Sequence, residues 1–252
     1  TRTFERAGLI GLIALGAVAT GHVDPAAAAG PRGPTTFFSN KLAYEQGYSA
    51  FRTGEYHLAI PGLTFAAQNG WVPAKFYLAQ IYGDSSGPLT DHSRAYNLYL
   101  EIVSDLANRV DPDDPIAPIV AKSLVALGRY VHSGLPQNHV KADAVRAAEY
   151  FRIAAHGMND EDGQFELAKM LLVGDGVAAD PGLAKHHLSS LSQSGHAGAQ
   201  AVLADLYWRG KHIARNPVQA LGLIEIARRN APARDQIWID DIYQNIYCGA
   251  PV

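Results

Sequence analysis

The chain has 252 residues, an apolar content of 48% and a formal net charge of −3 at pH 7. Its 21 Lys and Arg residues are scattered, and because nucleic-acid binding needs a concentrated basic surface, we expect no nucleic-acid partner. Cys248 is the only cysteine, which excludes an internal disulfide. It leaves either a buried thiol, the interpretation we favour, or a bond to another chain.

Residues 1–29 have the organisation of a secretory signal peptide. Two arginines precede an apolar run from Gly8 to Ala19, and small residues with Ala-x-Ala sites follow it. The run is too short to span a hydrocarbon core of about 30 Å, although an uncleaved anchor stays open as the alternative. We therefore expect export, no membrane insertion after cleavage, and a flexible lead-in over residues 30–38.

Helical periodicity takes over at Ser39, with no convincing strand pattern. It predicts about five pairs of helices, each joined by a short loop. The predicted pairs span residues 39–70, 73–109, 116–157, 161–195 and 196–230. A last helix, from Arg234 to Tyr247, is expected to cover the exposed end of the fifth pair. The prediction is an all-α fold: a right-handed α-solenoid over 39–232, with a capping helix and tail over 233–252.

A short phrase recurs in the first helices of four pairs. It reads Leu78-Ala79, Leu127-Gly128, Leu167-Ala168 and Leu203-Ala204. The small second residue of the phrase would let neighbouring helices approach closely. The second helices of these pairs carry start signals, and the predicted N-caps are Asp91, Asp180 and Asn216.

Taken in order, these residues resemble the Sel1-like repeat, a tetratricopeptide-like family of helix pairs. The fourth pair carries the likeness best, with Leu167-Ala168, Gly174-Asp175-Gly176-Val177, Asp180 and Gly195-His196. The repeat spacing varies around a base of about 36 residues, whereas tetratricopeptide repeats keep to 34. The resemblance covers roughly residues 40 to 230 and implies a protein that binds other proteins.

A narrower resemblance is to the ExoR family of periplasmic exopolysaccharide regulators. It rests on the export signal, a tetratricopeptide-like first pair, degenerate Sel1-like pairs, and a long third pair that an acidic loop over residues 111–118 opens. This resemblance implies a periplasmic protein that holds a membrane sensor kinase inactive by binding the periplasmic domain of the kinase.

One serine motif invites a catalytic interpretation. The sequence from Gly83 to Gly87 fits G-x-S-x-G, with Ser85 at its centre, but a nucleophile elbow needs a strand before the serine. A helix is predicted there instead. No Ser-x-x-Lys acylation pair occurs in the chain. We expect no catalytic residue and no enzymatic activity.

Ten histidines invite a metal-binding interpretation. No H-E-x-x-H motif occurs, and His186 and His187 are neighbours on a predicted helix, so their side chains point about 100° apart. His196 sits in a turn between two pairs. No phosphate-cradling glycine motif occurs either. We expect no metal ion and no cofactor.

The first helices of such a solenoid line its concave face, where a partner would bind. On the first pair, Tyr44, Tyr48 and Arg52 fall on one side of the helix, opposite the small residues Ala43 and Gly47. Later pairs place Arg129, Trp208 and Arg209 comparably. Tyrosine, tryptophan and arginine dominate binding hot spots, so these six are the predicted contact residues. Packing of the two tyrosines against a neighbouring helix stays open as the alternative.

These observations favour a non-catalytic, exported repeat protein. We expect it to act as a negative regulator in the periplasm by binding a protein partner, with the periplasmic domain of a sensor kinase as the implied candidate. Two alternatives stay open: a structural scaffold in an envelope or polysaccharide-export complex, and a cell-wall or β-lactam hydrolase.

Overall fold

The computed structural model describes residues 39–249 apart from 86 and 108. The predicted signal peptide and lead-in over 1–38 therefore lie outside the described residues. Within the described part, eleven α-helices are present, and the only pairing of β type is an isolated bridge between Leu135 and Val140. The predicted all-α fold is confirmed.

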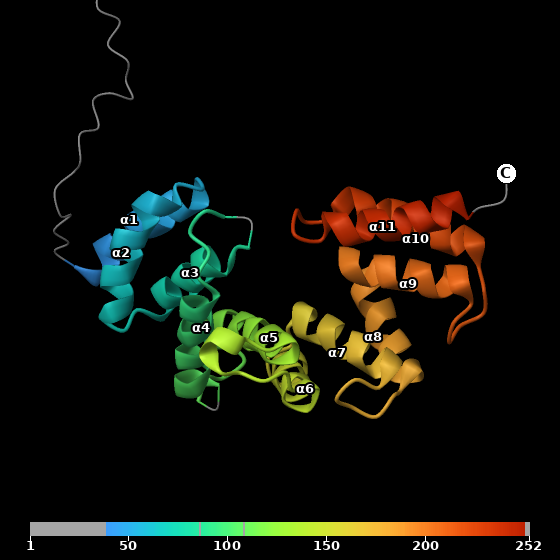
Figure 1. Ribbon diagram of the computed structural model, residues 1–252, viewed down its shortest axis with the longest axis horizontal. Coiled ribbons are helices and arrows are strands. Elements are labelled where there is room, and N and C mark those ends of the chain that lie inside the picture. Colours follow the sequence, from blue (N-terminus) through green and yellow to red (C-terminus); the bar gives the residue numbers. More distant parts are fainter. Residues whose placement is uncertain (1–38, 86, 108, 250–252) are drawn as a thin grey trace, which may run out of the picture. The chain divides into compact units, whose positions relative to one another are not determined.

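The helices follow one another along the chain with short connections (Figure 1). Their bounds are α1 Asn40–Arg52, α2 Tyr56–Gln68, α3 Val72–Gly83, α4 His92–Leu106, α5 Ala117–Ser133, α6 Ala144–Arg152, α7 Glu161–Val173, α8 Pro181–Gln193, α9 Ala197–Arg209, α10 Pro217–Asn230 and α11 Gln236–Cys248. Two short elements interrupt this series, a 3₁₀ turn at Pro136–Asn138 and a π-helical turn at Ile153–Gly157 that continues α6.

Side chains cap the N-termini of most helices. The three predicted caps are confirmed: a side-chain oxygen of Asp91, Asp180 and Asn216 accepts a hydrogen bond from the backbone N–H three residues further on, at 3.0, 2.9 and 3.1 Å. Such a bond satisfies one of the free donors in the first turn. Ser39, Asp143 and Asp160 accept the same bond through a side-chain oxygen, and His196 accepts it through Nδ1.

Each helix packs against the next one in the chain, from α1 through to α11. The first helices of neighbouring pairs also touch: α1 contacts α3, α3 contacts α5, α5 contacts α7, and α9 contacts α11. Contacts of this local kind, repeated from pair to pair, are the defining property of a solenoid.

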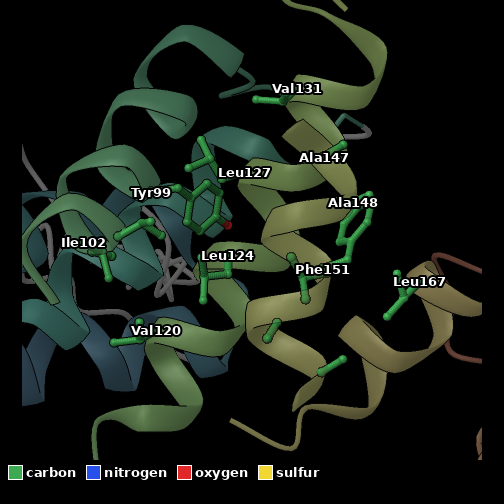
Figure 2. Close-up of a cluster of buried hydrophobic side chains, with 14 of the residues drawn as sticks. Tyr99, Ile102, Val120, Leu124, Leu127, Val131, Ala147, Ala148, Phe151 and Leu167 are labelled. Carbon is green, nitrogen blue, oxygen red and sulfur yellow. The ribbon is translucent and has the colours of Figure 1, made fainter. Parts of the chain in front are cut away.

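The core consists of several apolar clusters arranged along this series of helices. Figure 2 shows part of the largest cluster, to which α4, α5, α6 and α7 contribute side chains such as Tyr99, Leu124, Phe151 and Leu167. The small residues of the recurring phrase, Ala79, Gly128, Ala168 and Ala204, are all buried. Their burial agrees with the predicted close packing, and at Gly128 an added Cβ would lie 2.6 Å from the Phe151 ring of α6.

The C-terminal helix packs as expected but leaves its cysteine in solvent. Ile239 and Ile246 of α11 are fully buried in a cluster with Ile224 and Ala204. Cys248, at the end of α11, is exposed, so the expected buried thiol is wrong. It occupies the solvent face of a helix whose opposite face is buried.

Candidate protein-binding surface

The two predicted tyrosines of α1 lie in an aromatic cluster between α1 and α3. The ring of Tyr48 is 4.7 Å from that of Tyr77 and 5.7 Å from that of Tyr44, between ring centroids. The Phe51 ring is 4.9 Å from Tyr77. These rings are half-buried, and burial raises the pKa of Tyr44 and of Tyr77, so their hydroxyls stay protonated. Tyr44 and Tyr48 thus pack against a neighbouring helix, as the alternative describes, while Arg52 is exposed at the end of α1. Contact of these three residues with a partner stays a prediction.

Arg129 belongs to a charged cluster that sequence reasoning did not foresee as a unit. Its Nε and Nη2 atoms both lie 2.8 Å from Oε1 of Glu166 on α7, and Nζ of Lys169 lies 2.6 Å from Oε2 of the same carboxylate. Glu166 is only 9% exposed, whereas the side chains of Arg129 and Lys169 are 43% and 44% exposed. Two cations thus share one buried carboxylate, which leaves this cluster with a net positive charge.

This charged cluster stands in a groove of about 470 Å³, which we call the α5–α7 groove. Its apolar lining comes from Phe151, Met170 and Val173. A second polar pair lines it, because Nε2 of His132 lies 2.7 Å from Oδ2 of Asp175. The groove therefore combines charged groups with an apolar lining, which is the usual composition of a binding site.

A comparison of the repeats would have found Glu166. The position before the leucine of the recurring phrase is Tyr77 in the second pair, Ala126 in the third, Glu166 in the fourth and Val202 in the fifth. Glu166 is the single charged residue in this column. The column two residues after that leucine holds Gln80, Arg129, Lys169 and Asp205, so Arg129 and Lys169 occupy equivalent places in successive pairs.

The remaining two predicted contact residues lie in the fifth pair, apart from this groove. Trp208 is half-buried, with the guanidinium carbon of Arg215 5.3 Å from its ring centroid. Nε of Arg209 lies 2.7 Å from Oδ1 of Asp205, in an i,i+4 pair at the surface. The structure therefore distributes the six predicted residues over three places, and the one at Arg129 lines a groove.

A second ion network surrounds Asp162 on α7. Nη2 of Arg234, which precedes α11, lies 3.0 Å from its carboxylate, Nε2 of His196 lies 3.6 Å away and Nζ of Lys122 3.9 Å away. The neighbouring His196 ring and then the charge of Arg234 hold the pKa of Asp162 well below its usual range, against the opposing effect of burial. This network ties α7 to α5, to the start of α9 and to the segment before α11.

Replacing Asp162 with asparagine should lower the free energy of unfolding by about 2 kcal/mol, because charge-assisted hydrogen bonds are lost while the cations stay partly hydrated. For a chain of this length, that corresponds to a fall in melting temperature of about 4–8 °C. The pKa of Asp162 is depressed in the folded state, so its contribution is complete above the unfolded value of about 3.9 and disappears as pH falls through the folded value. The difference between the two proteins should therefore shrink below about pH 4.

Thermal unfolding followed by circular dichroism measures this prediction. The control is Asp205→Asn, which removes the exposed i,i+4 pair with Arg209 and should cost less than about 0.5 kcal/mol. If both variants lose the same free energy of unfolding, the network around Asp162 contributes no more to stability than a surface ion pair does.

Ser85 lies next to a histidine but lacks the backbone setting of a nucleophile. Its Oγ is 3.4 Å from Nε2 of His92, whose Nδ1 lies 2.9 Å from the hydroxyl of Tyr130. Ser85 is exposed and follows the helix α3, whereas a nucleophile elbow follows a strand. The motif thus stands in the wrong secondary structure for acyl transfer.

A histidine of the π-helical turn after α6 lies near two histidines of α8. The His187 ring centroid is 5.8 Å from that of His156 and 6.1 Å from that of His186, and burial lowers the pKa of His187. Among the described residues, no three His, Cys, Asp or Glu side chains converge in a way that could hold a metal ion. In the same part of the chain, every helix is too short or too polar to cross a bilayer.

Comparison with protein families gives one match that covers more than half of the chain. The model described as "Sel1 repeat" matches residues 72–101, 121–157, 161–196 and 197–230. These segments include α3 and most of α4, most of α5 with α6, and the helices from α7 to α10.

Two relatives from rhizobia are described as "Exopolysaccharide production negative regulator". The protein from Rhizobium meliloti (strain 1021) is 27% identical over 244 residues, which cover 96% of this chain and 87% of the relative. The protein from Rhizobium leguminosarum bv. viciae is 26% identical over 204 residues, which cover 81% and 74%.

Solved structures with the same architecture were also found. A Sel1 repeat protein from Oxalobacter formigenes superimposes with a TM-score of 0.64 at 20% identity, over 83% of this chain and 76% of that one. A protective antigen of uropathogenic Escherichia coli, described as displaying an SLR fold, gives a TM-score of 0.56 at 23% identity over 82% of this chain. This chain covers 42% of that longer protein. At these identities the likeness concerns the fold alone.

Proposed function

The chain belongs to the Sel1 repeat family, and from this premise we propose that it is a non-catalytic negative regulator of exopolysaccharide production that acts by binding a protein partner. The observation that carries the proposal is the similarity, over 96% of this chain, to a relative described as a negative regulator of that process. The α5–α7 groove supports it, since it offers polar and apolar contacts on a rigid helical framework.

The proposed place of action is the periplasm, reached through a signal peptide over residues 1–29, and the proposed partner is the periplasmic domain of a membrane sensor kinase. A repressor of this kind must bind the inactive state of its partner more tightly than the active state, because equal affinity shifts no equilibrium. To move the partner from almost fully active to almost fully inactive, this preference must reach about 10⁴-fold.

Deletion of the gene in the bacterium that encodes this chain is expected to raise exopolysaccharide output severalfold, because a repressor is lost. The measurement is polysaccharide per cell, with the intact gene supplied in trans as the control that restores repression. A chain that lacks residues 1–29 should fail to restore it if export is required. Output that falls on deletion would contradict the proposal and favour the scaffold.

Crosslinking in intact cells, followed by purification of the tagged chain, tests the partner. The expected product is a covalent adduct between this chain and an integral membrane kinase. The crosslinked residue of the kinase should lie in its periplasmic domain. Recovery of only polysaccharide-export components would argue for the structural role instead.

A further inference from the structure

We propose that the α5–α7 groove binds an extended peptide segment of the protein partner in which an aspartate or glutamate lies beside an apolar side chain. This inference rests on the proposed function, since it names the chemistry that the partner presents. It is carried by the exposed cations of Arg129 and Lys169, by the apolar lining of the groove and by the repeat position of Glu166.

The exposed cations of the charged cluster favour an acidic ligand. Arg129 and Lys169 together carry two positive charges, and Glu166 balances one of them. The other carboxylate of the groove, Asp175, is paired with His132. The guanidinium has five N–H donors and the ammonium has three, so donors remain after both side chains have bonded to Glu166. Both side chains are more than two-fifths exposed, so the remaining donors can reach a carboxylate in the groove.

The fold itself does not need an ionised group at this place. The equivalent residues of the other pairs are Tyr77, Ala126 and Val202, so contacts between successive first helices form with an aromatic or aliphatic side chain there. Burial of Glu166 costs desolvation free energy, and an apolar residue would avoid this cost. The charge of Glu166 therefore answers no requirement of the packing between successive first helices.

The apolar lining explains why the acidic residue should have an apolar neighbour. Val173, at the end of α7, is 67% exposed and offers an accessible apolar contact, while Met170 and Phe151, which line the same groove, are buried. A volume of about 470 Å³ accommodates a few side chains rather than a folded element.

Two fluorescently labelled octapeptides test the proposal in solution: one alternates Asp and Leu, and the other alternates Asn and Leu. Each peptide is titrated with the chain that lacks residues 1–29, and binding is followed by fluorescence anisotropy. The Asp peptide is expected to bind at least about tenfold more tightly than the Asn peptide, and its affinity should fall as salt is added. Equal affinity for the two peptides, or no saturable binding of either, would overturn the proposal.

Substitutions at Val173 locate the binding without disturbing the fold, because the side chain is largely exposed. Val173→Asp should weaken binding of the Asp peptide about tenfold by placing a like charge in the groove, whereas Val173→Lys should preserve or strengthen it. The matched control is Val145→Asp on α6, which is 68% exposed and lies outside the groove lining, and which should leave the affinity unchanged. Identical effects of Val173→Asp and Val145→Asp would refute the assignment to the groove.

The same variants separate this inference from the proposed function in cells. If the intact chain restores repression and the Val173→Asp chain at equal abundance does not, the proposed function and the assignment to the α5–α7 groove are both supported. If both chains repress equally, the groove assignment fails while the proposed function stands. If the intact chain does not affect polysaccharide output, the proposed function itself fails. A dimer of the intact chain that Val173→Asp dissociates would assign the groove to a second copy and overturn the partner peptide.

Discussion

Replacement of Gly176 with alanine is expected to lower the free energy of unfolding by about 4 kcal/mol. Gly176 lies in the loop between α7 and α8 with φ at +68°, a left-handed conformation that a side chain disfavours. A Cβ atom there would lie 2.3 Å from both the carbonyl carbon and the oxygen of Ala144, at the start of α6. Because both obstructing atoms belong to the backbone, the loop or α6 must move.

A matched variant separates the two causes. Gly54, between α1 and α2, has φ at +77° and no heavy atom within 4 Å of an added Cβ. Gly54→Ala therefore carries the conformational cost alone, about 1 kcal/mol. Urea denaturation followed by far-ultraviolet circular dichroism compares the two variants. If Gly176→Ala lowers the free energy of unfolding no more than Gly54→Ala does, the loop can shift away from α6 without cost.

Truncation of Phe151 to alanine is expected to cost about 4 kcal/mol, the other large effect. Phe151 is 2% exposed and belongs to the largest core cluster, to which α4, α5, α6 and α7 contribute (Figure 2). Its removal leaves a cavity in this cluster, which the surrounding side chains fill only in part. The control is Val145→Ala on the same helix, which is 68% exposed and should change stability by less than about 0.5 kcal/mol.

Gly128 offers a coupled test of the same contact. A Cβ atom on Gly128 would lie 2.6 Å from Cε1 of Phe151, so Gly128→Ala alone should destabilise the chain by about 1–3 kcal/mol. In the background of Phe151→Ala the added methyl group enters the vacated space, and the same change should cost little or become stabilising. If the double variant loses as much free energy of unfolding as the two single variants together, Gly128 and Phe151 do not pack closely.

The predicted contact residues depend on neighbours that lie far away along the chain. The sequence places Tyr44 and Tyr48 on one side of α1, and that side packs against Tyr77 of α3. Residue type singles out Arg129, but its carboxylate partner, Glu166, lies 37 positions further along the chain. The sequence favours a buried thiol for Cys248, which is exposed because the buried stripe of α11 runs through Ile239 and Ile246.

The sequence by itself determined the helices, their caps and the repeat family. Each of these depends on interactions within a few residues: a cap such as Asp180 bonds to a backbone N–H three positions away, and the helical period of apolar residues marks the buried stripe. Only the tertiary structure decided which polar groups meet between repeats. Asp162 reaches Arg234 across 72 positions, and Arg129 reaches Glu166 between α5 and α7. Such pairings depend on how buried side chains set the relative placement of neighbouring helices, and a pattern read along one helix does not contain that placement.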